Sequence, residues 1–285
     1  MDDLEKYRKF GQDLIDKLKL LTYPIAVKIM KEGDEMPKGN FFRPHKFFGY
    51  FVPTCTTHYW VRTSGYSFYL EGEDISCAPS SYLYYGLEES ENHPETVYKG
   101  WAKYAGFKED IEAEKSSRAT DYTFEPGEIK GLLLSPLNNT LVKPDVVLIY
   151  CISLALGSLI LSATYEGDCI NSEFNGMEAS CKGVVKTYKT NQCNVACPGL
   201  GDRTAGNASA IEMLFFIPES KLEMVTNNLF KAGNKQGSGF GPASNPYAIP
   251  HIVASVGSNR IFGQVAVGDA PQWRYSRKRN VKNKK

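Results

Sequence analysis

The sequence predicts an α+β protein in which a mixed sheet is flanked by helices. Helix-like and strand-like segments alternate along its 285 residues without a long regular repeat of strand and helix, a pattern typical of α+β domains. Hydrophobic residues make up 42% and charged residues 23%, which are globular values that argue against collagen, coiled coils and long disorder. We expect one globular domain over residues 1–271, because one large core fits this length, and a basic tail over 272–285.

The N-terminal segment predicts a helix from Asp3 to about Leu20, followed by a strand. Apolar residues recur there at helical spacing. They are Leu4, Tyr7, Phe10, Leu14, Leu18 and Leu21. Pro24 ends the helix, and residues 25–29 are typical of a strand. Glycines and prolines then predict a loop over residues 31–46.

The next third of the chain predicts short, mixed elements. Residues 47–70 are rich in aromatic side chains and partly alternate, which indicates strands with a short helix after Thr54. A turn signal at Pro79 opens a helix that runs to about Leu87. The polar stretch 88–128 predicts surface helices.

The remaining elements are predicted from their apolar runs. Residues 128–134 and 210–217 indicate strands, and Pro218 opens a further helix. Residues 146–163 carry no charge and approach the length of a membrane span, but their strand-like start and their serines favour a buried strand that runs into a buried helix. Residues 233–246 are rich in Gly, Ser and Asn and predict a loop.

Cysteine spacing gives a weak indication of an old internal duplication. Cys55 precedes Cys77 by 22 residues, and Cys151 precedes Cys181 by 30. Each second cysteine precedes an apolar run, as a repeated unit would. Coincidence in an aromatic-rich chain is the alternative.

The charge balance gives no overall reason to expect a nucleic-acid or membrane partner. The net charge is +1. Seven of the twelve residues from Arg274 to Lys285 are basic, so the rest of the chain carries about −6. We interpret this tail as a solvated end or as a docking arm for an acidic partner protein or, less expected, for nucleic acid. The N-terminus has no apolar signal core, which predicts a cytoplasmic location, and the oligomeric state stays open.

Seven cysteines in a chain without a signal segment indicate metal binding or redox chemistry rather than a disulfide framework. They are Cys55, Cys77, Cys151, Cys169, Cys181, Cys193 and Cys197. Cys193 and Cys197 lie four residues apart, and the Pro-Gly turn after them frees backbone amides to bond to sulfur. The sequence has no Cys-x-x-Cys pair, which disfavours a zinc ribbon. A rigid turn with one buried thiol is the alternative.

Cys55 and Cys77 each lie beside a turn and could converge with Cys197 in the folded chain. Three thiolates would hold a 4Fe–4S cluster with one open iron, or a zinc ion with one open position. Cys193 or Cys181 is the candidate fourth ligand. Spacing alone does not establish that these cysteines meet.

Polar residues near these cysteines are candidates for catalysis and substrate binding. His58, three residues after Cys55, is a candidate ligand or acid–base group, with a half-buried structural histidine as the alternative. Arg203 follows Gly199 and Gly201, which would let a cofactor or ligand approach the backbone, and its planar fork suits a carboxylate or phosphate. Arg62 could do the same, and a salt bridge is the alternative for both arginines.

Five short motifs occur in a characteristic order. They are LTYPIAVKI (21–29), LYYGL (83–87), PDVVLI (144–149), ACPGLGDR (196–203) and IPESKLEMV (217–225). Together they resemble the prokaryotic family catalogued as domain of unknown function 169. That family is largely uncharacterised and occurs often in anaerobes. The resemblance implies that Cys55, Cys77 and Cys197 are recurring cysteines, followed by Gly199 and Arg203.

Three functions fit these features. In our working hypothesis, the chain is an iron–sulfur protein, a redox or lyase-type enzyme that acts on a small anionic metabolite at a three-cysteine 4Fe–4S cluster. The second is a metal-free thiol enzyme with Cys197 as nucleophile, activated by Arg203. The third is a non-catalytic module that binds an anionic metabolite or cofactor and docks a partner through its tail. The substrate and the reaction stay open.

Overall fold

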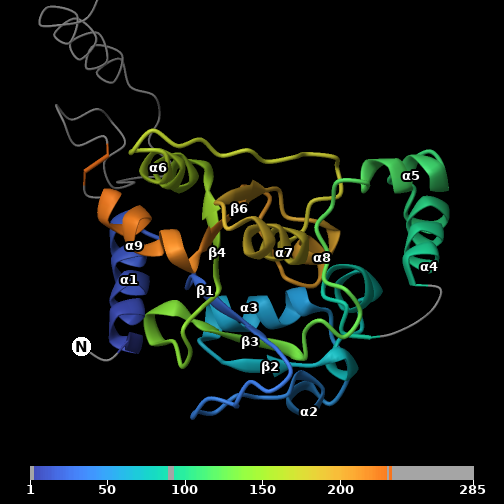
Figure 1. The fold of residues 1–285 in the computed structure, drawn as a ribbon, viewed down its shortest axis with the longest axis horizontal. Helices are drawn as coiled ribbons and strands as arrows, with labels where there is room; N and C mark the ends of the chain where they lie inside the picture. Colours follow the sequence, from blue (N-terminus) through green and yellow to red (C-terminus); the bar gives the residue numbers. More distant parts are fainter. Residues whose placement is uncertain (1–2, 89–92, 230, 233–285) are drawn as a thin grey trace, which may run out of the picture.

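A six-stranded antiparallel sheet forms the centre of the protein (Figure 1). The computed structural model describes residues 3–88, 93–229 and 231–232. The strands are β1 (Ile25–Met30), β2 (Phe68–Leu70), β3 (Gly131–Pro136), β4 (Val146–Ile152), β5 (Asn194–Ala196) and β6 (Glu212–Pro218). Their order is β2-β3-β1-β4-β6-β5, and all pairings between these strands are antiparallel. The α+β class is confirmed, but the expected mixed sheet is corrected to an antiparallel one, which needs no long crossovers between parallel strands.

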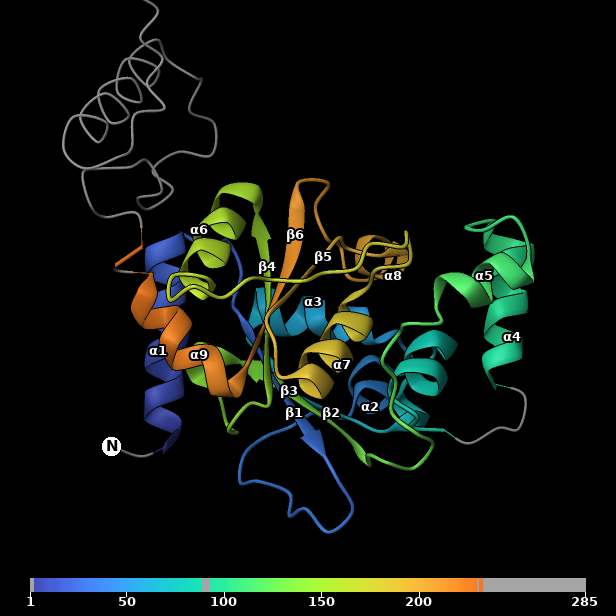
Figure 2. The same cartoon turned by 45° about the horizontal axis from the view of Figure 1, so that its top comes forward.

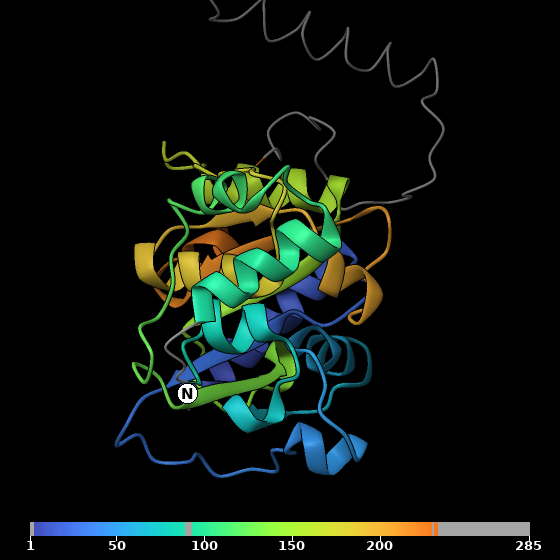
Figure 3. The ribbon, with the colours of Figure 1, turned by 90° about the vertical axis from the view of Figure 1, so that its right-hand side faces the viewer.

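Helices cover both faces of this sheet. One face carries α1 (Asp3–Leu18), α6 (Ser153–Ala163) and α9 (Glu219–Asn228), and the other carries α3 (Thr54–Ser64) and α7 (Ser180–Thr190). Shorter helices are α2 (Pro44–Phe48), α4 (His93–Gly100), α5 (Ile111–Ser117) and α8 (Leu200–Thr204), the π-helices η2 (Pro79–Tyr84) and η3 (Trp101–Ala105), and the 3-10 helices η1 (Gly72–Asp74) and η4 (Leu137–Asn139). Figure 2 shows α1, α6 and α9 at one end and α4 and α5 at the other, and Figure 3 looks onto α4 and α5.

Strand alternation divides the buried residues into two cores. On β4, Leu148 and Tyr150 face the first core, which α3, α7 and η2 cover. Val147 and Ile149 face the second core, which α1, α6 and α9 cover. Successive side chains of a strand point to opposite faces, and burying one large apolar side chain contributes roughly 1.5–3 kcal/mol. Both faces of this strand are therefore apolar, as the uncharged stretch predicted.

The prediction for the uncharged stretch is confirmed, and the predicted first helix needs one correction. Residues 146–163 form β4 and α6 as predicted. The first helix ends at Leu18, because Lys19 adopts the left-handed conformation with φ of 52°. The chain turns there, so Leu21, which the pattern placed on the buried face, is 88% exposed.

Three elements between residues 180 and 204 were missed by the sequence prediction. They are α7, β5 and α8. A glycine in the middle of α7, Gly183, weakened the helical signal. The structure gives it a packing role, because a Cβ atom at Gly183 would lie 2.1 Å from the ring of Phe216 on β6.

Several predictions fall outside the described part of the chain. The loop over 233–246 and the basic tail over 272–285 belong to this group, so the domain end at residue 271 is untested. The internal duplication also stays a prediction. Among the described residues, no helix combines the length and the apolar character that crossing a membrane requires.

Candidate functional site

Three cysteines from separate segments meet on the first-core side of the sheet. Cys55 is the second residue of α3, Cys181 is the second residue of α7, and Cys77 lies just before η2. Burial raises the pKa of the Cys55 thiol well above its ordinary value, and the charges of Asp202, Cys181 and Cys77 raise it further. Charge effects of this kind are largest between groups about 4–6 Å apart. We call Cys55, Cys77 and Cys181, with the Tyr85 hydroxyl described below, the thiol site.

Hydrogen bonds between neighbours of the cysteines fasten these segments together. The hydroxyls of Thr54 and Ser80 lie 2.7 Å apart and join the start of α3 to η2. The Ser180 hydroxyl lies 3.2 Å from Nδ1 of His58 and 4.0 Å from Sγ of Cys55, which joins α7 to α3. The approach of the three cysteines is therefore built into the packing of α3, η2 and α7.

Backbone groups around the thiols favour negative charge. Cys55 and Cys181 lie in the first turns of α3 and α7, each 11 residues long, and the positive end of a helix dipole stabilises a thiolate. Burial raises the pKa of Cys77, and a hydrogen bond from the Ser80 backbone N–H lowers it in part. Burial likewise raises the pKa of Cys181, which the Lys182 N–H lowers in part. Since burial dominates, the thiols are protonated in the metal-free protein.

Asp202 is a fully buried carboxylate at the edge of the thiol site. Its Oδ1 accepts a hydrogen bond from the Tyr150 hydroxyl at 2.8 Å. Its Oδ2 accepts the backbone N–H groups of Ser180 and Gly199, each at 3.0 Å. The carboxylate thus ties β4 to the first residue of α7 and to Gly199, which directly precedes α8.

Two buried polar atoms have no hydrogen-bond partner among the described residues, namely Nε2 of His58 and the hydroxyl of Tyr85. Both side chains are fully buried. Burial lowers the pKa of His58, the Asp202 charge raises it and the Arg62 charge lowers it; the net pKa is about 4, so this histidine is neutral at pH 7. Unpaired buried polar atoms are uncommon in native proteins and often mark a place for a ligand, a metal or a water.

The predicted anion-binding role of Arg62 is only partly matched by its surroundings. Its guanidinium is buried and donates to Glu212 at 2.9 Å and to the carbonyl oxygens of Gly206 and Asn207 at 3.1 and 3.0 Å. It also stacks on the Tyr150 ring, with its carbon 4.3 Å from the ring centroid. Only Nε lacks a partner among the described residues, so most of this fork already binds protein groups.

The segment with Arg203 packs against the thiol site rather than opening towards a ligand. Arg203 is exposed, and its Nε donates to the Pro198 carbonyl at 3.0 Å. A Cβ atom at Gly199 would lie 2.4 Å from a backbone oxygen, and one at Gly201 would lie 3.1 Å from Sγ of Cys55. The two predicted cofactor-binding glycines therefore allow close packing around α8.

The other two predicted thiol ligands are placed differently. Cys193 is buried in the second core, on the opposite face of the sheet from Cys181. Cys197 is half-buried between β5 and α8. The charge effects on Cys55 come from Asp202, Cys181 and Cys77, in that order, and the largest ones on Cys181 come from Cys77 and Asp202. The structure thus groups Cys55 and Cys77 with the alternative ligand, Cys181, and leaves Cys193 apart.

The sequence reasoning missed Ser180, Asp202 and the role of Tyr85. One usable signal was that Cys55 and Cys77 stand beside predicted turns and that Cys181 precedes an apolar run, since helices often begin at such places. Another was the acidic residue three positions after Gly199, the spacing at which a side chain caps a helix start. Among the described residues, no group of three or more His, Cys, Asp or Glu side chains is arranged to hold a metal ion.

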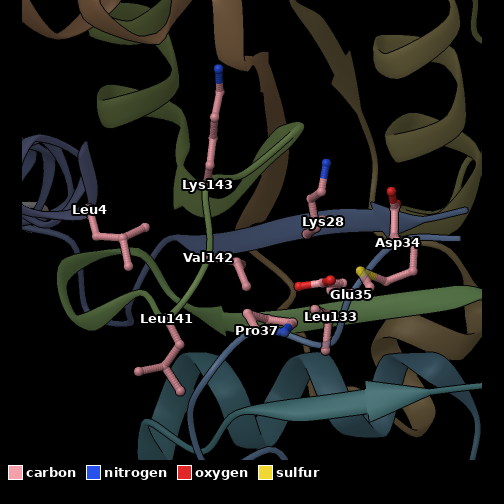
Figure 4. Close-up of a pocket in the computed structure, with 10 residues that line it drawn as sticks. Leu4, Lys28, Asp34, Glu35, Pro37, Leu133, Leu141, Val142 and Lys143 are labelled. Carbon is pink, nitrogen blue, oxygen red and sulfur yellow. The ribbon is translucent and has the colours of Figure 1, made fainter. Parts of the chain in front are cut away.

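A surface cavity of about 350 Å³ lies away from the thiol site, beside β1 and β3 (Figure 4). None of the predicted site residues lines it. Figure 4 shows the charged ends of Lys28 and Lys143 pointing away from Val142, Pro37 and Leu133. A smaller cavity of about 170 Å³ is lined in part by Tyr150 and Glu212, and therefore lies beside the Asp202 network.

Comparisons with known proteins identify a family but no function. The model of the DUF169 family, described as uncharacterised ArCR, matches residues 13–228. No curated protein and no solved structure matches the chain. The family match covers more than half of the sequence and includes every residue of the thiol site. The chain belongs to the DUF169 family.

Proposed function

We propose that this chain binds a 4Fe–4S cluster at the thiol site and uses it in a redox or lyase-type reaction on a small anionic metabolite. The observation that carries the proposal is the meeting of Cys55, Cys77 and Cys181 from three segments in one buried place. Cysteine thiolates are the usual ligands of such clusters. The support for a cluster comes from the chemistry of these residues and not from a related protein.

The donor set fits a cluster. Iron must bind thiolates, so loading would release the protons that burial holds on the three thiols. The helix starts at Cys55 and Cys181 and the N–H groups near sulfur would then stabilise the negative charge that remains. In a cubane each thiolate binds a different iron, so its ligands need not surround one ion as zinc ligands do.

A cluster held by three thiolates keeps one iron without a protein thiolate. Bound there, the cluster would supply electrons or Lewis-acid polarisation. Arg62 contributes the positive charge next to this region, and His58 contributes a neutral ring. Among the described residues, neither Nε of Arg62 nor Nε2 of His58 has a hydrogen-bond partner. The charge of Arg62 favours an anionic substrate at this end of the site, and the His58 ring could exchange a proton with it.

The metal-free thiol enzyme receives less support. A thiol nucleophile needs a lowered pKa, but burial raises the pKa of all three clustered thiols. The arginine expected to activate Cys197 is Arg203, which is exposed and bonded to a backbone carbonyl.

The test is the iron and acid-labile sulfide content of the full chain purified without oxygen. The proposal expects about four of each per chain, a broad visible absorption band, and loss of both after Cys55→Ser. A colourless chain without iron or sulfide after reconstitution would contradict it, as would one zinc ion per chain without sulfide.

A further inference from the structure

Tyr85 differs from the other buried tyrosines around the thiol site. Its side chain is fully buried, and its hydroxyl has no partner among the described residues. The hydroxyl of Tyr84 donates to Asp121 at 3.0 Å, and that of Tyr150 donates to Asp202 at 2.8 Å. Since the neighbouring tyrosines are satisfied within the protein, the free hydroxyl of Tyr85 calls for a specific explanation.

The proposed ligands are part of the surroundings of this side chain: Tyr85 belongs to the same packed cluster as Cys181, and Cys77 packs against that cluster. After burial itself, the charges that act most strongly on Tyr85 are those of Cys181, Cys55, Asp202 and Cys77, in that order. A tyrosine phenol keeps its proton at neutral pH, so this unpaired hydroxyl is available as a donor. A group placed among three thiols, with a proton to give, is suited to bond to sulfur that becomes negatively charged when iron binds.

The local backbone is unusual at this position. Tyr85 immediately follows η2, a π-helix, and its N–H bonds to the Ser80 carbonyl five residues back at 3.0 Å. π-helical turns are rare and occur often at functional sites, because the wider turn changes the direction of the side chains that follow. Here the wide turn separates Cys77 from Tyr85 while both stay within the thiol site.

We propose that the Tyr85 hydroxyl donates a hydrogen bond to the sulfur of the cluster and thereby raises its reduction potential. The proposal rests on the proposed function, because it assigns a role to a residue of the same site. Reduction adds negative charge to the cluster, so a donor to sulfur stabilises the reduced form more than the oxidised form. Tyr85 is in this sense a tuning residue and not a ligand.

The test compares Tyr85→Phe with Tyr69→Phe in the full chain purified without oxygen. Tyr69 is the matched control, because its buried ring lies outside the thiol site and its hydroxyl donates to Glu71 at 2.7 Å. Both variants should hold the wild-type amount of iron and sulfide. A redox titration followed by visible absorption should give a more negative midpoint for Tyr85→Phe and an unchanged midpoint for Tyr69→Phe.

The outcomes separate the two proposals. A wild-type chain without iron refutes the cluster itself. A loaded Tyr85→Phe chain with the wild-type midpoint refutes the hydrogen bond, and a Tyr85→Phe chain that cannot load iron shows a ligand or structural role instead. Urea unfolding of the metal-free chains adds a second check. Removing an unpaired hydroxyl should leave the urea concentration at half-unfolding unchanged or raise it. If Tyr85→Phe lowered that urea concentration as much as Tyr69→Phe does, Tyr85 would already have a hydrogen-bond partner in the metal-free protein.

Discussion

Asp202 connects three segments of the molecule through its two carboxylate oxygens, and its replacement is the sharpest test at the residue scale. Asp202→Asn would turn one oxygen into an NH₂ group that faces N–H or O–H donors. We expect a loss of about 2–4 kcal/mol in the free energy of unfolding, because buried donors would lose their acceptor. Urea unfolding measures this. The control is Asp168→Asn, an exposed carboxylate paired with Lys221, and equal effects of the two variants would contradict the role given to Asp202.

His58 should make the stability of the metal-free chain depend on pH. Its pKa is about 4 in the folded protein and about 6.5 in the unfolded chain. Between these values the unfolded state binds the proton and the folded state does not, so stability falls as the pH drops from 6.5 towards 4 and is fully retained above 6.5. Lowering the pH from 7 to 5 should therefore reduce the free energy of unfolding by about 2 kcal/mol through this histidine. Urea unfolding at both pH values should show a smaller decrease for His58→Gln than for wild type, and identical decreases would refute the assignment.

Individual residues also show how far sequence reasoning could reach into the site. His58 was a candidate because it lies three residues after Cys55, and the structure places both residues in α3, where that spacing puts two side chains on one face. Cys193 was favoured because it lies near Cys197 in the sequence. Strand alternation points the Cys193 side chain towards the second core. Only the register of β5 on β6 determines which face of the sheet that side chain takes. Tyr85 belonged to an aromatic run that resembles ordinary core.

At the scale of elements, α7 carries the clearest prediction. Gly183→Ala should destabilise the protein although alanine favours helices by about 1 kcal/mol. The added methyl group would collide with the Phe216 ring, and overpacking of this kind costs about 1–3 kcal/mol. Gly100→Ala is the control, because no described atom lies within 4 Å of a Cβ there. Thermal unfolding should show a lower midpoint for the first variant only, and a gain for Gly183→Ala would contradict the packing.

Elements with a strong pattern of their own were predictable, whereas those defined by contacts were not. The uncharged run 146–163 became β4 and α6 because every residue in it tolerates burial. The strand β5 has only three residues, too few to show alternation, and exists through its pairing with β6. The π-helix η2 was predicted as an ordinary helix, since no periodicity distinguishes a short wide turn.

At the scale of the whole molecule, the fold brings together what the sequence separates. The α+β class followed from composition and element order, but the antiparallel arrangement depends on which strands become neighbours. The same packing places the starts of α3 and α7 over one face of the sheet and brings Cys55 within reach of Cys181, 126 positions later in the chain. The thiol site is thus a product of tertiary structure, and motif spacing alone could not define it.

The most direct test of the central claim is to measure iron and acid-labile sulfide in Cys181→Ser and Cys193→Ser, purified side by side without oxygen. Both cysteines are buried, at 6% and 5% exposure, so the two changes place similar strain on the cores. The account predicts that Cys193→Ser keeps the wild-type iron and sulfide and that Cys181→Ser loses most of both. Retention in Cys181→Ser with loss in Cys193→Ser would show that the thiol site described above does not hold the cluster.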